Sequence, residues 1–77
     1  MKDEELNKRI GFELRNQRLL HRMTLERVAT LLNVSSRNTI SYIELGKTSI
    51  DVETLIRYCK AVGCDWREVL DKATKED

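Results

Sequence analysis

The sequence predicts an all-α fold, a compact domain of five short helices. The chain has 77 residues, no proline and only three glycines. Leu, Glu, Lys and Arg are abundant, and these residue types favour helices over strands. Residues suited to helix ends (Thr, Ser, Asp, Asn and Gly) separate the apolar stretches at short intervals. A chain of this length fits one domain, residues 1–77, and we expect its core within about 6–71.

The first two helices are indicated by an apolar stripe and by two end residues. We expect the first helix over residues 4–20. Its apolar residues recur at four-residue spacing, which places them on one face: Leu6, Ile10 and Leu14. The second helix follows Thr24, whose hydroxyl can accept a hydrogen bond from an unpaired backbone N–H group. It ends near Asn33, a residue type that tolerates the left-handed conformation of a helix end, and Val34 then fills the turn as a buried residue.

The third helix is predicted over residues 37–45, with Ser35 or Ser36 as its N-cap and Gly46 at its end. Two apolar residues point toward the core: Ile40 and Ile43. The polar residues left facing outward lie mostly near the N-terminal end: Arg37, Asn38, Ser41 and Tyr42.

Two further helices complete the predicted fold. Asp51 can cap the fourth helix and Gly63 can end it. Its inward residues are predicted to be Val52, Leu55, Ile56, Cys59 and Val62. Asp65 and Glu68 have the three-residue spacing of a capping box, which opens a fifth helix through Trp66, Val69 and Leu70. We expect the tail, residues 73–77, to fray.

Charge is distributed unevenly along the chain. Residues 7–47 carry eight basic and three acidic side chains, a net charge of +5. Residues 48–77 carry five basic and seven acidic side chains, a net charge of −2. A basic half suits a polyanion such as DNA, although an ordinary solvated helical surface gives the same pattern. No stretch approaches the length of a membrane span, and the acidic N-terminus is unlike a signal peptide, so we expect a cytoplasmic protein without membrane association.

The sequence does not point to a catalytic, metal or cofactor site. Cys59 and Cys64 lie five residues apart without a second metal-type pair, and His21 is distant from them. We expect both cysteines to be reduced and to pack as small apolar residues. No nucleophile stands at motif spacing from His21, and there is no glycine-rich phosphate loop. The sequence therefore predicts a protein that is not an enzyme and takes no cofactor, metal or small-molecule ligand.

Residues 24–45 have the pattern of a helix-turn-helix, two short helices joined by a tight turn. Ala29 is small at the point where the second of these helices must cross the first. Val34 and Ile40 can fix the crossing angle, so that the second helix projects rigidly. A helix held in this way fits the major groove of DNA, where its N-terminal side chains reach base edges.

The ordered set of residues from Ile10 to Leu70 resembles the XRE-like helix-turn-helix family of the phage lambda repressor and Cro type. The matching positions are Ile10-Gly11, Leu14-Arg15, Arg18, Met23-Thr24, Val28-Ala29, Leu32 to Ser35, Ile40 to Lys47, Glu53 to Leu55 and Ala61 to Gly63. The resemblance implies a five-helix DNA-binding domain that acts as a homodimeric transcription regulator, a repressor or controller, on an inverted-repeat operator. It also implies an ion pair between Arg18 and Glu44 that ties the first helix to the third.

The helix-turn-helix pattern and the family resemblance together predict which residues contact DNA. Residues predicted to contact bases are Arg37, Asn38, Thr39, Ser41 and Tyr42. Residues predicted to contact phosphates are Ser35, Ser36, Lys47, Thr48 and Arg27. Arg37 suits guanine because a guanidinium can pair with O6 and N7, although a phosphate contact or a solvated arginine is the alternative. The predicted dimer interface consists of Tyr58, Val62, Trp66 and Leu70, and the alternative for these residues is the core of a monomer.

Three departures from the family pattern leave questions open. Leu25 stands where the family commonly has Gln, and Asn33 stands where it commonly has Gly. One extra residue separates Val34 from Ile40, so the register of the base contacts stays open by about one position. The alternative function is a protein-interaction module, or an antitoxin-like partner, with the same fold.

Overall fold

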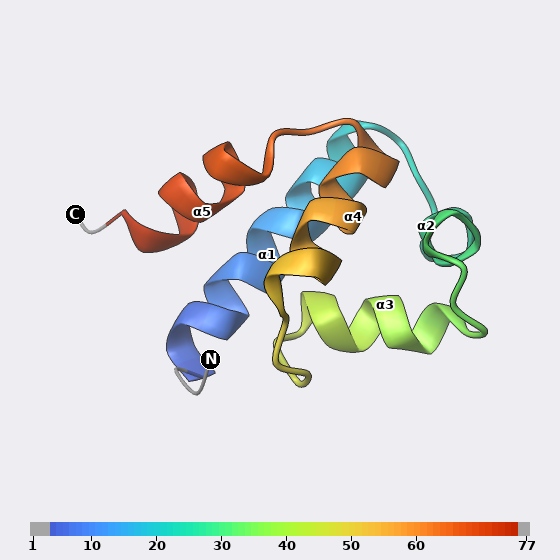
Figure 1. Cartoon of the computed structure of the whole chain (residues 1–77), viewed down its shortest axis with the longest axis horizontal. Coiled ribbons are helices and arrows are strands. Elements are labelled where there is room, and N and C mark those ends of the chain that lie inside the picture. Colours follow the sequence, from blue (N-terminus) through green and yellow to red (C-terminus); the bar gives the residue numbers. More distant parts are fainter. Residues whose placement is uncertain (1–3, 76–77) are drawn as a thin grey trace.

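The computed structural model describes residues 4–75, which form five α-helices joined by short connections (Figure 1). The helices are α1 (Glu4–Leu20), α2 (Leu25–Leu32), α3 (Arg37–Glu44), α4 (Val52–Val62) and α5 (Trp66–Thr74). The described residues contain no strand, so the predicted all-α fold is confirmed. Helix α1 packs against α3, α4 and α5, while α2 packs against α3 and α4. No helix within residues 4–75 is long and apolar enough to cross a membrane.

Side chains cap the N-termini of the last four helices. The capping side chains and the backbone amides that donate to them are Thr24 with Arg27, Ser36 with Asn38, Asp51 with Thr54, and Asp65 with Arg67. Ser36 and not Ser35 is therefore the N-cap of α3. The capping box predicted for α5 is wrong in detail, because the Asp65 carboxylate binds the amide of Arg67 and not that of Glu68.

Residues with a positive φ follow the first four helices, and after α1 this residue is Arg22, with a φ of 56°. Asn33 has a φ of 59° after α2, and Gly63 has a φ of 92° after α4. After α3, Leu45 is still right-handed and Gly46 turns the chain with a φ of 73°. The amide of Lys47 then donates to the carbonyl of Tyr42 at 3.0 Å, which satisfies the end of α3 and fixes the direction in which the chain leaves it.

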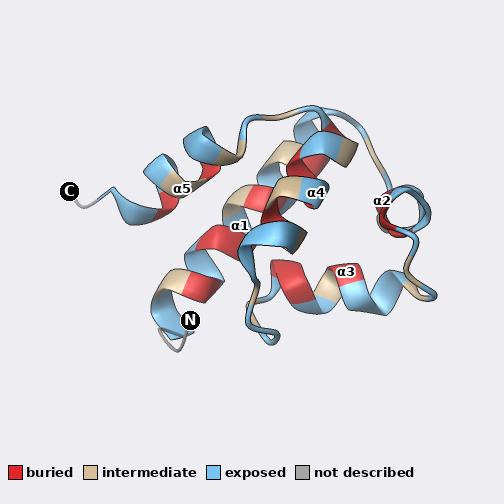
Figure 2. Cartoon of the chain, viewed as in Figure 1, coloured by how far each residue is buried: buried red, intermediate tan, exposed pale blue. Residues whose placement is uncertain are grey.

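The core lies where the inward faces of the five helices meet, as the buried positions in Figure 2 show. Its buried apolar residues are Ile10, Leu14, Val28, Ala29, Leu32, Ile40, Ile43, Leu55, Tyr58, Cys59, Val62, Val69 and Ala73. Val34 in the turn is only partly buried and packs against this cluster. The assignment of Tyr58 and Val62 to a dimer interface is wrong, because their side chains are 0% and 4% exposed within one chain. Both residues contribute to the monomer core instead.

Two smaller predictions at helix ends are also wrong. Val52 was expected to face inward, but it lies in the first turn of α4 and is 67% exposed. Ala73 was expected to fray, but it is buried and α5 continues to Thr74. Glu76 and Asp77, the end of the tail that we expected to fray, lie outside the described residues.

Helix α1 approaches the end of α3 closely at Gly11. A Cβ atom placed on Gly11 would lie 2.4 Å from the carbonyl oxygen of Ile43 and 2.6 Å from that of Glu44. Only glycine permits this separation, because no real Cβ atom approaches another heavy atom so closely. Gly11 therefore sets the distance between α1 and α3, and with it the position of α3 on the molecule.

Candidate nucleic-acid interface

Helix α3 presents one side to the core and the other to solvent. It lies along one edge of the molecule, and the connection 45–51 continues that edge (Figure 1). Ile40, Ile43 and Glu44 are buried. Asn38 and Tyr42 are four residues apart, so they share the opposite, exposed side. This pattern agrees with the prediction that Ile40 and Ile43 face the core while Asn38 and Tyr42 face outward.

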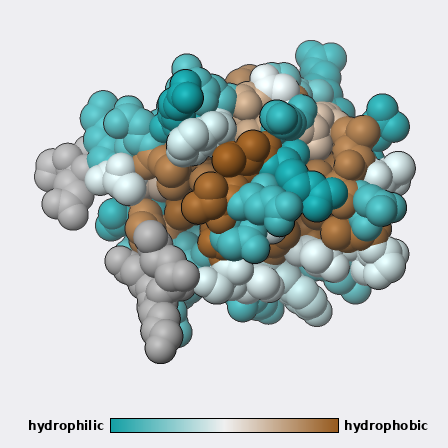
Figure 3. Space-filling model, viewed as in Figure 1, coloured by the Kyte–Doolittle hydropathy of each residue, from teal (hydrophilic) through white to brown (hydrophobic). Residues whose placement is uncertain are grey.

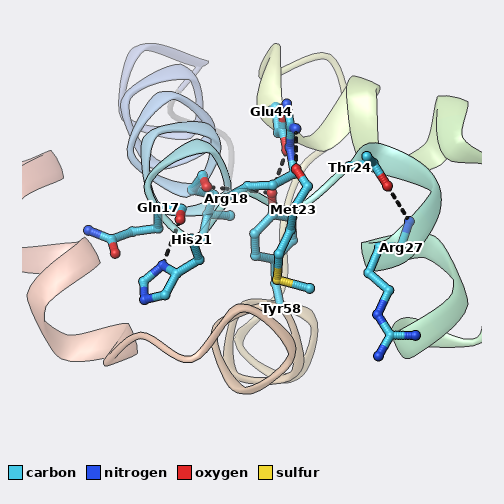
Figure 4. Close-up of polar contacts among 9 residues, drawn as sticks. Gln17, Arg18, His21, Met23, Thr24, Arg27, Glu44 and Tyr58 are labelled. Carbon is cyan, nitrogen blue, oxygen red and sulfur yellow. Dashed lines mark hydrogen bonds and ion pairs between the residues drawn. The ribbon is translucent and has the colours of Figure 1, made fainter.

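The predicted ion pair between α1 and α3 is present and is part of a larger network (Figure 4). The Arg18 guanidinium donates to both carboxylate oxygens of Glu44, from Nε at 2.7 Å and from Nη2 at 3.1 Å. Arg18 Nη1 also donates to the carbonyl oxygen of Met23 at 2.9 Å. The Tyr58 hydroxyl donates to Glu44 Oε2, which brings α4 into the same network. Sequence reasoning missed Tyr58, because an aromatic residue among apolar neighbours gives no sign of its hydroxyl partner.

Arg18 and Tyr58, two members of this buried network, both have a raised pKa. Arg18 and Glu44 are only 8% and 6% exposed. The hydrogen bond from Arg18 to Glu44 raises the pKa of the arginine further. Desolvation, together with the bond to Glu44, raises the pKa of Tyr58 well above its usual value. The network therefore joins α1, α3 and α4 through buried hydrogen bonds, which suits a rigid support for α3.

The connection after α3 is held by a side chain that the sequence reasoning did not single out. Asn7 Nδ2 donates to the carbonyl oxygens of Gly46 at 3.1 Å and Thr48 at 2.7 Å. Its Oδ1 accepts from the amide of Ile50 at 3.1 Å. Asn7 is itself buried. A polar residue beside Leu6 in the apolar stripe of α1 was the available signal for this role. The three bonds fix the segment that carries Lys47 and Thr48.

Replacing Asn7 by alanine is expected to destabilise the fold by about 1–3 kcal/mol, because partly buried backbone groups of the connection lose their hydrogen-bond partners. Urea denaturation measures this loss. Hydrogen exchange at the Ile50 amide should also quicken. Lys8→Gln is the control, because Lys8 is an exposed neighbour on the same helix. Gln is chosen because the stem of Lys8 lies beside Gly46, and a long side chain keeps that contact. Unchanged exchange at Ile50 in Asn7→Ala would contradict the role assigned to Asn7.

The predicted phosphate-contacting residues are exposed except Ser36, which is partly buried as the cap of α3. Lys47 lies beside the exposed side of α3, with its Nζ atom 5.7 Å from the centre of the Tyr42 ring. Ser35 and Thr48 are exposed in the two connections that flank α3. The Arg27 side chain, in contrast, extends away from the end of α3 that carries Glu44 (Figure 4). The structure thus places Lys47 beside Tyr42 on α3, whereas Arg27 points away from the Glu44 end of that helix.

Two of the predicted base-contacting residues lie at the flanks of α3. Thr39 is exposed and lines a hollow of about 310 Å³ with Ile43, Thr48 and Thr54, between α3 and the start of α4. Ser41 is partly buried on the other flank. Among the predicted base-contacting residues, Arg37, Asn38, Thr39 and Tyr42 are exposed and Ser41 is partly buried.

Arg37, the first residue of α3, forms an ion pair that was not predicted from the sequence. Its Nη1 atom donates to Oε2 of Glu26 at 3.0 Å. Glu26 lies in the first turn of α2, so the pair bridges the two helices of the helix-turn-helix. A bond to its own backbone amide and the bond from Arg37 lower the pKa of Glu26. Leu25 is partly buried against the core, so the residue in the family's usual Gln position packs in this chain.

No cluster of metal-ligating side chains occurs among residues 4–75. Cys59 is buried, Cys64 is partly buried, and both are free thiols. Burial raises the pKa of both, so neither has the character of a reactive thiolate.

Comparison with known proteins also identifies a helix-turn-helix in this chain. A family model described as helix-turn-helix (HTH_3) matches residues 14–69. The crystal structure of the clp gene regulator ClgR from C. glutamicum superimposes on this chain with a TM-score of 0.84 and 31% sequence identity. The match covers 88% of this chain and 87% of the ClgR chain. No curated protein sequence matches this one.

Proposed function

The chain belongs to the XRE-type helix-turn-helix family and is a DNA-binding transcription regulator, and from this premise we propose that it recognises one specific operator sequence as a homodimer. The proposal includes an inverted-repeat operator and a role as a repressor or controller that acts without catalysis or cofactor. One observation carries it: the exposed side of α3 is polar while its other side is locked to the core through Ile40, Ile43 and Glu44.

The roles of the side chains divide between positioning and selection. Lys47, Thr48 and the amides at the start of α3 suit phosphates that flank the groove. Arg37 suits guanine and Asn38 suits adenine, since each can pair with two groups on the major-groove edge of that base. Tyr42 lies one turn further along on the side that Asn38 occupies, where its ring can contact a base or a phosphate.

Arg37→Ala is expected to weaken binding to the operator by about 1–3 kcal/mol and to relax selection at one base pair. Fluorescence anisotropy with the operator, with single-base-pair variants of it and with a random duplex measures both effects. Lys47→Ala is the matched variant, because loss of a phosphate contact should weaken operator and random duplex alike. An Arg37→Ala protein that weakens equally on all duplexes would make Arg37 a phosphate contact and not a base contact.

Selection of bound duplexes from a random pool is the direct test of the function itself. Recovery of a palindrome supports both sequence specificity and two-fold symmetry. The dependence of binding on salt separates the proposal from the alternative of a protein-interaction module: counterion release makes DNA binding fall steeply as salt rises, and an apolar protein interface does not behave in this way. Failure to enrich any sequence would contradict the proposal.

An apolar surface formed by α1, α5 and the start of α4 supports the homodimer. Figure 3 shows apolar side chains gathered on the viewed face in this region. A groove of about 350 Å³ there is lined by Ile10, Ile50, Val52, Leu55 and Leu70 together with Asn7 and Asp51. Leu70 was among the residues predicted for a dimer interface.

Val52→Glu is expected to convert the dimer to a monomer, because Val52 is 67% exposed at the edge of this groove and its replacement places like charges near the two-fold axis. Analytical ultracentrifugation with and without the operator measures the change. The protein should remain folded, since Val52 contributes little to the core. The control is Val69→Ala. Val69 is buried within one chain, so this variant should lower the stability of the fold without converting the dimer to a monomer. Unchanged sedimentation of Val52→Glu would place the interface elsewhere.

A further inference from the structure

We infer that Glu26 is a specificity-determining residue of the DNA site: it holds Arg37 so that this arginine selects a guanine in each operator half-site. Glu26 acts here through Arg37 and is in that sense a positioning residue. The inference rests on the proposed function and extends it by naming one base pair that the half-site must contain.

The ion pair has a distinct place among the charges of the molecule. It joins α2 to α3 over 3.0 Å on the exposed surface of the helix-turn-helix. The other ion pairs within residues 4–75 lie along α1, between Glu5 and Arg9, and inside the core, between Arg18 and Glu44. No carboxylate among the described residues pairs with Lys47, the cation beside Tyr42. Arg37 is thus the cation at the surface of α3 that carries a carboxylate partner.

Stability does not account for this arrangement. The side chains of Arg37 and Glu26 are 60% and 62% exposed, and ion pairs exposed to this degree contribute little to folding. Arg37 also places a positive charge at the N-terminus of α3, where the helix dipole disfavours cations. We therefore assign the pair a different role: Glu26 orients the guanidinium of Arg37.

The chemistry of the pair favours a base over a phosphate. A guanidinium has five N–H donors, and Glu26 engages Nη1, which leaves Nε and Nη2 for two parallel bonds to guanine O6 and N7. A free arginine on a flexible stem can turn to the nearest phosphate, whereas a tethered one loses that freedom. The Glu26 carboxylate also repels phosphates. Its lowered pKa keeps it ionised at neutral pH. The expected result is weaker binding to random DNA and sharper selection of guanine.

Three substitutions separate these effects. Glu26→Gln keeps the shape and an acceptor but removes the charge. Glu26→Asp keeps the charge but shortens the reach to Arg37 by one methylene. Glu68→Gln is the control, because Glu68 is an exposed carboxylate in the first turn of α5, away from α3 in Figure 1. Binding is measured by fluorescence anisotropy at constant salt. The probes are a duplex selected by the wild-type protein, the same duplex with each base pair changed in turn, and a random duplex.

The wild-type protein is expected to prefer guanine by about 5- to 150-fold at the base pair that Arg37 contacts. Glu26→Gln and Glu26→Asp should reduce that preference severalfold at the base pair affected by Arg37→Ala. Only Glu26→Gln should also bind the random duplex more tightly than wild type, since only it removes the repulsive charge. Glu68→Gln should match wild type in every arm. In the background of Arg37→Ala, Glu26→Gln should cause no further loss of selectivity.

Either of two results overturns the inference alone: full guanine preference in both Glu26 variants, or a loss at a base pair that Arg37→Ala leaves unaffected. A wild-type protein with no sequence preference overturns the proposed function, and the inference with it. Thermal melting accompanies each variant. Because Glu26 is exposed, both variants should melt as wild type does, and Glu26→Asp repeats the test should Glu26→Gln alter the fold.

Discussion

Glu44→Ala is expected to destabilise the protein by about 3–5 kcal/mol, because it leaves the buried Arg18 guanidinium without its counter-charge and the Tyr58 hydroxyl without its acceptor. Domains of this size have total stabilities of only about 5–15 kcal/mol, so the variant should lose a large share of it. The melting temperature should fall by about 15 °C or more. Urea denaturation followed by circular dichroism gives the free energy directly.

Three companion variants divide the effect. Tyr58→Phe removes only the hydroxyl and should cost about 1–3 kcal/mol, the value of a hydrogen bond to a charged group. Glu44→Gln keeps hydrogen-bonding atoms but not the charge and should fall between Tyr58→Phe and Glu44→Ala. Glu53→Ala removes an exposed carboxylate from α4 and should change stability by no more than about 0.5 kcal/mol. If Glu44→Ala melts as Glu53→Ala does, the network does not stabilise the fold.

Gly11→Ala is expected to destabilise the protein by about 2 kcal/mol or more, although glycine to alanine inside a helix usually stabilises by about 1 kcal/mol. The sign reverses because the new methyl group would overlap the carbonyl oxygens of Ile43 and Glu44. These are backbone atoms and cannot turn aside as a side chain can, so α1 and α3 must separate. The separation also lengthens the bonds between Arg18 and Glu44. DNA affinity should fall with stability, because α3 shifts on its support.

Asn16→Ala is the matched control for Gly11→Ala. Asn16 is exposed on α1, and alanine is the better helix former, so this variant should equal or exceed the wild type in stability. Both are measured by thermal melting and urea denaturation under the same conditions. Greater stability of Gly11→Ala than of the wild type would show that α1 and α3 are not in close contact at this point.

The helix boundaries and the buried stripes followed from the sequence because both depend on neighbours along the chain. Thr24, Ser36 and Asp51 cap the helices that they were expected to cap, through bonds to amides two or three residues away. Asn33 and Gly63 likewise end α2 and α4 in the left-handed conformation. Such local interactions are encoded in short segments, so composition and spacing are sufficient to predict them.

The candidate site was predicted in outline and not in its contacts. The residues of α3, with Asn38 and Tyr42 among those facing outward, were identified from the resemblance and from their polarity, and both are exposed in the structure. Tyr58 was placed in a dimer interface, since a periodic apolar pattern does not distinguish a core from an interface between copies. The bridge from Glu26 to Arg37 spans 11 residues and two helices, a separation at which sequence spacing carries no signal.

The sequence by itself determined an all-α fold, the extent of each helix to within a few residues, and a helix-turn-helix whose second helix is polar on one side. Only the tertiary structure showed which contacts hold α3 and the connection after it. These are the close contact at Gly11, the three hydrogen bonds of Asn7, and the network of Glu44 with Arg18 and Tyr58. The physical reason is the separation along the chain over which each kind of interaction acts. Caps and periodic stripes act over one or two helical turns, whereas buried charge pairs and close helix contacts join residues that only the folded chain brings together.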